Sequence, residues 1–246
     1  SRGLGDVYKR QIQGLTDSLR RASSDAAASH AQVQRLLELD RRLHFAVQER
    51  PEGYGHAVWC AREFVGSEPF LLLVSDHLYV SGEQRRCARQ ILDLAAQENC
   101  AVAAVQATRE HLIGRYGTVA GKRLTGQPHV FQIEEIIEKP HPSLAEQHLH
   151  VPGLRVGYYL CLFGMQVLTP TIFAILDTHV KTRDDDRAPI QLTPALRELA
   201  GRERYLALQT VGRRHDIGIK YGLLEAQIAL AMAGVDRDHV LAHLVE

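Results

Sequence analysis

The chain has 246 residues, of which 45% are hydrophobic and 24% are charged, values typical of a globular protein with one large domain. Lys plus Arg and Asp plus Glu both number 29, and this zero net charge disfavours a dedicated nucleic-acid binder, which carries a basic excess. The four cysteines show no CxxC spacing, which disfavours a disulfide scaffold or a structural zinc site and favours a reducing cytoplasm.

The start of the chain looks foreign to the rest. Residues 6–11, DVYKRQ, back-translate as GAT GTG TAT AAG AGA CAG, which resembles a transposon end used in preparing sequencing libraries. We therefore expect residues 1–11 to be an adapter-derived artefact and residues 12–246 to be a partial domain whose own sequence begins upstream. The alternative is an ordinary flexible N-terminus.

The first half of the chain predicts alternating helices and strands. Apolar residues recur at helical spacing over 16–43, which predicts one or two surface helices. The next elements are a short strand, a helix, a buried strand, an amphipathic helix and a second buried strand, over residues 44–48, 56–65, 70–74, 84–97 and 101–105. Strand, helix and strand in this order are typical of a doubly wound α/β sheet. The continuous apolar runs of both strands indicate burial on both faces, as in parallel sheets.

The second half predicts further strands over 116–120, 130–137, 155–163 and 205–211, and helices over 169–176, 192–199, 220–233 and 236–245. One uncharged stretch, residues 156–176, is long enough to span a bilayer. Its glycines and the pair Thr169-Pro170, a good helix start, favour a buried strand followed by a helix instead.

A glutamine and a glycine turn form the first candidate binding motif. Gln48 precedes Gly53-Tyr54-Gly55, and a predicted helix follows. Glycine lets a backbone approach a flat ligand closely, because no Cβ intervenes. The glutamine amide complements the N3–H and a carbonyl of uracil or thymine. Such turns are also common before helices that bind no ligand.

Two further candidate motifs stand at strand ends. Asp76 follows the apolar run 70–74, and ligands in open α/β sheets bind outside the carboxyl ends of strands. Its carboxylate suits a hard cation such as magnesium. Glu138-Lys139-Pro140 closes another strand, where a glutamate can accept bonds from sugar hydroxyls and a lysine suits phosphate. The ordinary alternatives are a turn aspartate and a surface ion pair.

These motifs occur with three further segments, PIQLT at 189–193, HDIG at 215–218 and LCLFGMQVLTP at 160–170. Their order and spacing resemble the sugar-phosphate nucleotidyltransferases, and among them the bacterial UTP–glucose-1-phosphate uridylyltransferases. The resemblance runs from about Phe45 to the C-terminus. It implies an α/β fold with a doubly wound, Rossmann-like mixed sheet. The family's glycine-rich GxGTR…PK signature is absent from the chain, so we expect the first strands and the phosphate loop to be missing.

The resemblance also implies roles for nine residues of this chain. Gln48 and Gly53 would hold the uracil base, and Gly117 and Glu138 would contact the glucose. Lys139 would contact the sugar phosphate, and Asp76 and Asp216 would bind the magnesium ion. Phe163 and Gly164 would line the sugar pocket. Of these, Asp76, Lys139 and Asp216 would be catalytic.

The implied reaction is transfer of a uridylyl group from UTP to glucose 1-phosphate, giving UDP-glucose and pyrophosphate, with Mg²⁺ as cofactor. The expected partners are these two substrates, without nucleic acid or membrane. The intact protein is expected to be a cytoplasmic homo-oligomer, and the chain without its phosphate loop is expected to be inactive by itself. One alternative is a transferase that uses dTTP or another sugar 1-phosphate. A second is a catalytically silent regulator that binds a sugar nucleotide.

Overall fold

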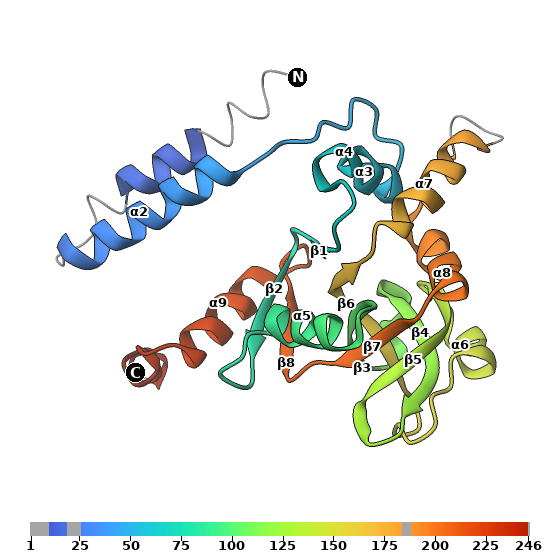
Figure 1. Ribbon diagram of the computed structural model, residues 1–246. Coiled ribbons are helices and arrows are strands. Elements are labelled where there is room, and N and C mark those ends of the chain that lie inside the picture. Colours follow the sequence, from blue (N-terminus) through green and yellow to red (C-terminus); the bar gives the residue numbers. More distant parts are fainter. Residues whose placement is uncertain (1–9, 19–25, 184–187, 246) are drawn as a thin grey trace.

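The fold is a mixed α/β arrangement, seen in a computed structural model that describes residues 10–18, 26–183 and 188–245 (Figure 1). A six-stranded sheet has the order β1-β6-β3-β7-β5-β4, and β2 and β8 form a separate two-stranded ribbon. The strands are β1 (Phe70–Leu73), β2 (His77–Ser81), β3 (Ala101–Arg109), β4 (Gly117–Leu124), β5 (Gln127–Glu138), β6 (Tyr158–Leu168), β7 (Tyr205–Gln209) and β8 (Gly212–Asp216).

The sheet is mixed, as expected, but most of its strand pairs are antiparallel. Only β3 and β7 pair in parallel among the described strands. The expectation that the run 70–74 is a strand of a parallel sheet buried on both faces is wrong. β1 pairs antiparallel with β6 and is only partly buried. An apolar run in the sequence indicates that a strand is buried. Whether the strand pairs in parallel or antiparallel depends on a partner strand far away in the sequence. β1 and β3 still run in the same direction, because both pair antiparallel with β6.

Helices cover both faces of the sheet (Figure 1). They are α2 (Ala26–Arg42), α3 (Tyr54–Cys60), α4 (Arg62–Val65), α5 (Cys87–Glu98), α6 (Pro142–His148), α7 (Thr171–Lys181), α8 (Leu192–Arg202), α9 (Gly222–Ala233) and α10 (Arg237–Val245), with a 3₁₀ turn at Glu110–Arg115. Residues 10–18 are also helical. The expected strand over 44–48 is wrong, since that segment has no regular structure. A strand needs a neighbour for its backbone groups, and none of the described strands pairs with this segment.

The alternation of side chains along β3 explains its apolar run. Ala101, Ala103 and Val105 belong to the core cluster on one face of the sheet, which α7 and α8 help to form. Val102 and Ala104 belong to the cluster on the other face, which α5 covers. Successive residues of a strand point to opposite faces, so a strand between two helical layers is apolar at every position.

The uncharged stretch 156–176 contains β6 and the start of α7, as the sequence predicts. No helix in the described part of the chain is long and apolar enough to cross a membrane. Residues 1–9 lie outside the described residues, so the proposed adapter boundary stays a prediction. Figure 1 shows α2 well away from the sheet, joined to α3 by an extended segment.

Candidate functional site

The β2–β8 ribbon brings together two aspartates that lie far apart in the sequence. His77 at the start of β2 is the direct partner of Asp216 at the end of β8. The amide of Ile217 donates a hydrogen bond of 2.8 Å to the carbonyl oxygen of Asp76. As a result, a carboxylate oxygen of Asp76, one of Asp216 and a ring nitrogen of His77 all lie within 4.8 Å of one another.

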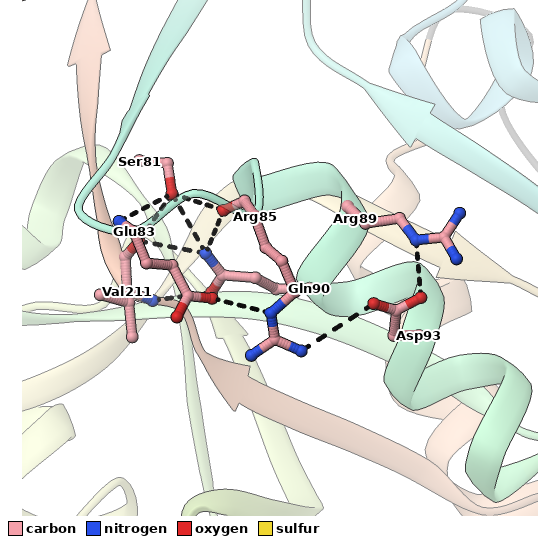
Figure 2. Close-up of polar contacts among 7 residues, drawn as sticks. All are labelled: Ser81, Glu83, Arg85, Arg89, Gln90, Asp93 and Val211. Carbon is pink, nitrogen blue, oxygen red and sulfur yellow. Dashed lines mark hydrogen bonds and ion pairs between the residues drawn. The ribbon is translucent and has the colours of Figure 1, made fainter. Parts of the chain in front are cut away.

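The far end of this ribbon is anchored by Gln90 of α5, a buried polar residue (Figure 2). Its amide nitrogen donates to the carbonyl oxygens of Arg85 and Val211, at 3.0 and 3.1 Å. Its amide oxygen accepts a bond of 2.9 Å from the backbone N–H of Val211. Ser81, the last residue of β2, donates to the Arg85 carbonyl oxygen at 2.6 Å. These bonds fix the ribbon to the sheet's covering helix, and so fix the direction in which its other end points.

The aspartate end of the ribbon is partly shielded from water. Burial lowers the pKa of His77, and the positive charge of Arg214 lowers it further. The negative charges of Asp76 and Asp216 raise this pKa, but the net shift is downward. Burial, together with the charge of Asp76, raises the pKa of Tyr54 to about 12. Tyr54 is therefore a neutral hydroxyl at physiological pH, able to donate a hydrogen bond.

A second group of polar residues lies where β4 begins and β5 ends. Gly117 and Glu138 are direct partners in this pair of strands. The hydroxyl of Thr193 donates a bond of 2.6 Å to Oε2 of Glu138, and Nζ of Lys139 lies 3.8 Å from Oε1. Lys139 has a φ of 46°, an unusual left-handed conformation for a lysine, and its amide donates to the carbonyl oxygen of Tyr116 at 3.1 Å.

Gly117 is required by close packing at this point. A Cβ at residue 117 would lie 2.9 Å from Cδ1 of Leu162 and 3.1 Å from Oε2 of Glu138. Any side chain would therefore press on the glutamate carboxylate. The glycine keeps the surface beside Glu138 open to a ligand.

Both polar groups line one cavity of about 250 Å³. Six of the nine residues singled out from the sequence line it: Asp76, Gly117, Glu138, Lys139, Gly164 and Asp216. Further lining residues with polar side chains were not singled out: Tyr54, His77, Arg115, Tyr116, Gln166, Gln191 and Thr193. Tyr54, Gln166, Gln191 and Thr193 stand within quoted motifs and others adjoin a motif residue, but sequence position does not reveal which way a side chain points.

The other three residues do not line this cavity. Nε2 of Gln48 donates a bond of 3.0 Å to the carbonyl oxygen of Gly53 and lies 3.0 Å from Nδ1 of His56. The structure thus brings Gln48 and Gly53 together, as one binding element would require. Phe163 is fully buried in the core cluster under α5, where its ring packs against that of Tyr79. Its side chain is therefore a core element.

The Asp76, His77 and Asp216 group has the chemistry of a divalent cation site. Carboxylate oxygens and an imidazole nitrogen are donors that divalent cations accept. Donors on opposite sides of a magnesium ion lie about 4 Å apart, so a separation within 4.8 Å needs only small side-chain rotations. Gly218 donates a 2.9 Å bond to Oδ1 of Asp216, which orients that carboxylate. The residues present therefore fit a bound cation.

Comparisons with known proteins point to one family. A family model described as nucleotidyl transferase matches residues 19–232. The UTP–glucose-1-phosphate uridylyltransferase YngB of Bacillus subtilis is 31% identical over 214 residues, covering 87% of this chain and 66% of that protein. A second Bacillus subtilis UTP–glucose-1-phosphate uridylyltransferase is 31% identical over 190 residues, covering 77% of this chain and 59% of that protein.

Among solved structures, UDP-glucose pyrophosphorylase complexed with UDP-glucose superposes with a TM-score of 0.69 at 27% identity. The match covers 90% of this chain and 78% of that one. The chain thus spans 59–66% of the length of the two curated relatives it matches.

Proposed function

This chain belongs to the nucleotidyl transferase family, and we propose that the protein transfers the uridylyl group of UTP to glucose 1-phosphate, giving UDP-glucose and pyrophosphate. The names of its Bacillus relatives support this choice of substrates. The observation that carries the proposal is the single cavity whose wall holds a cation site at one side and the Glu138-Lys139 pair at another.

We assign the sugar phosphate to the Glu138-Lys139 side of the cavity. The Lys139 side chain is 60% exposed, and its ammonium group can neutralise a phosphate. Glu138 accepts hydrogen bonds from sugar hydroxyls, and the bond from Thr193 holds its carboxylate in place. Gly117 leaves the space in which the sugar lies against Glu138.

The reaction needs positioning and charge neutralisation more than a covalent intermediate. A phosphate oxygen of glucose 1-phosphate attacks the α-phosphorus of UTP, and the bond to the pyrophosphate leaving group breaks as the new bond forms. A divalent cation held by Asp76 and Asp216 supplies neutralisation of the two anionic substrates when bound. Lys139 adds a fixed positive charge on the acceptor phosphate.

We infer that Gln48 and Gly53 bind the nucleotide base beside the cavity. The amide nitrogen of Gln48 is engaged by the Gly53 carbonyl, which leaves the amide oxygen to accept the N3–H of uracil. Thymine presents the same N3–H. The contact therefore selects a pyrimidine of this kind without separating UTP from dTTP.

The test is a substrate panel with the enzyme that contains this chain. UTP or dTTP is combined with glucose 1-phosphate or another sugar 1-phosphate, and the nucleotide sugar formed is quantified chromatographically. The proposal predicts the fastest turnover with UTP and glucose 1-phosphate. Faster turnover with dTTP or with another sugar contradicts it. Binding of UDP-glucose without turnover of any pair indicates a regulator instead. The expected homo-oligomer and cytoplasmic location stay predictions.

A further inference from the structure

His77 stands out because the reaction as described assigns the cation to Asp76 and Asp216 alone, although a ring nitrogen of His77 lies in the same group. It lines the same cavity as the two residues assigned to cation binding, and a ring nitrogen lies within 4.8 Å of a carboxylate oxygen of each. Its Nδ1 atom is buried and has no hydrogen-bond partner in the described part of the chain, although the backbone of Phe163 also interacts with the imidazole. A buried polar nitrogen without a partner is costly, so its retention calls for a ligand or another explanation.

We propose that His77 is a third protein ligand of the cation, and that the site therefore prefers a first-row transition metal such as Mn²⁺ to Mg²⁺. This inference rests on the proposed function, because it concerns the cation that Asp76 and Asp216 hold. It changes the chemistry of the site from an all-oxygen set to a mixed set of oxygen and nitrogen donors.

The ribbon geometry explains how the imidazole reaches the cation. His77 and Asp216 are directly opposite each other in an antiparallel pair, and such partners project on the same face of the ribbon. Asp76 immediately precedes His77, and its backbone oxygen is held by the amide of Ile217. Strand pairing thus places His77 and Asp216, and the backbone bond from Ile217 ties the turn that carries Asp76 to the end of β8.

Gly164 of β6 provides the space in which the ring of His77 lies. Its φ is 87°, and a Cβ there would lie 2.3 Å from Nδ1 of His77 and 2.8 Å from the hydroxyl oxygen of Tyr79. A side chain at residue 164 would therefore displace the imidazole. The Tyr79 hydroxyl donates a bond of 2.8 Å to the Gly164 carbonyl, which holds β6 against the ribbon. The ring is packed in place before any cation arrives.

The donor set decides the selectivity. Mg²⁺ prefers oxygen donors and retains several waters, whereas imidazole nitrogen suits Mn²⁺ less well than later transition metals but better than Mg²⁺. Replacing the imidazole by a carboxylate restores an oxygen set. The Mn²⁺ over Mg²⁺ preference should then fall, while total cation binding survives.

The experiment adds Mn²⁺ alone to this chain and records pulsed EPR spectra, which detect the ¹⁴N nucleus of a coordinated imidazole. α10 carries an exposed pair, His239 and His243, with ring centroids 4.4 Å apart, which could also bind metal. The spectra are therefore recorded in a His239→Ala/His243→Ala background. The variants made in it are His77→Asp and Asp216→Asn, each checked for an unchanged thermal unfolding midpoint.

We expect a ¹⁴N signal in the background protein, its loss in His77→Asp, and loss of the bound Mn²⁺ in Asp216→Asn. Competition with Mg²⁺ should show the Mn²⁺ preference falling about tenfold or more in His77→Asp. Mn²⁺ that depends on Asp216 but shows no ¹⁴N signal overturns this inference and leaves the carboxylate site of the proposed function standing. An unchanged preference in His77→Asp also overturns it. If the protein binds no Mn²⁺ that is lost in Asp216→Asn, the inference is also overturned. The substrate panel then tests the proposed function separately.

Discussion

Replacing Gln90 by leucine is expected to lower the free energy of unfolding by about 2 kcal/mol, roughly half of what its four hydrogen bonds would contribute at roughly 1 kcal/mol each, because water replaces part of the loss. The side chain is 7% exposed and makes bonds with the backbone of Arg85 and Val211 and with the hydroxyl of Ser81 (Figure 2). Leucine is similar in size but offers no polar atom, so the Val211 N–H loses its partner. Val211 is 48% exposed, and water can therefore replace part of the loss.

The assay is urea unfolding followed by the fluorescence of the single tryptophan, Trp59, and by circular dichroism. The matched control is Arg89→Ala on the same helix, which removes an ion pair with Asp93 whose arginine side chain is 70% exposed. Arg89→Ala is expected to lower the free energy of unfolding by less than about 1 kcal/mol. A Gln90→Leu protein as stable as the control would refute the view that Gln90 anchors the ribbon.

Three further substitutions test the packing and the sugar side of the cavity. Gly121→Ala should cost about 3 kcal/mol or more, measured by urea unfolding, because its Cβ would lie 1.9 Å from the backbone oxygen of Gln132. Gly117→Ala should weaken UDP-glucose binding in calorimetry about tenfold by pressing on Glu138, and full affinity would contradict this. Lys139→Ala should raise the KM for glucose 1-phosphate about tenfold, and an unchanged KM would remove its phosphate role.

The sequence predicts the buried elements of this fold well, because burial leaves a pattern. The strand over 101–105 and the helix over 84–97 are confirmed as β3 and α5, with bounds shifted by a few residues. The ribbon strands β2 and β8 were missed. Their sequences, HLYVS and GRRHD, are short and partly polar, and they form strands because they pair with each other across more than 130 residues.

The candidate site was predictable only where a motif marks it. Asp76 and Asp216 were singled out through the family resemblance, and the structure brings their carboxylates together. His77 was not singled out, because a histidine next to an aspartate forms no distinctive sequence pattern. Its place in the cavity wall depends on the register in which β2 and β8 pair. Arg115 was missed for the same reason, since it lies in a 3₁₀ turn whose orientation only the fold determines.

The most direct test of the account is the turnover of Asp76→Asn in the enzyme that contains this chain, with Asp93→Asn as the matched control. Asparagine keeps the size of the side chain but removes the charge that holds the cation. We predict that UDP-glucose formation falls at least about a hundredfold, with the unfolding midpoint unchanged, while the control retains its activity. Turnover of Asp76→Asn equal to that of the unsubstituted enzyme would contradict the assignment of this cavity as the site of uridylyl transfer.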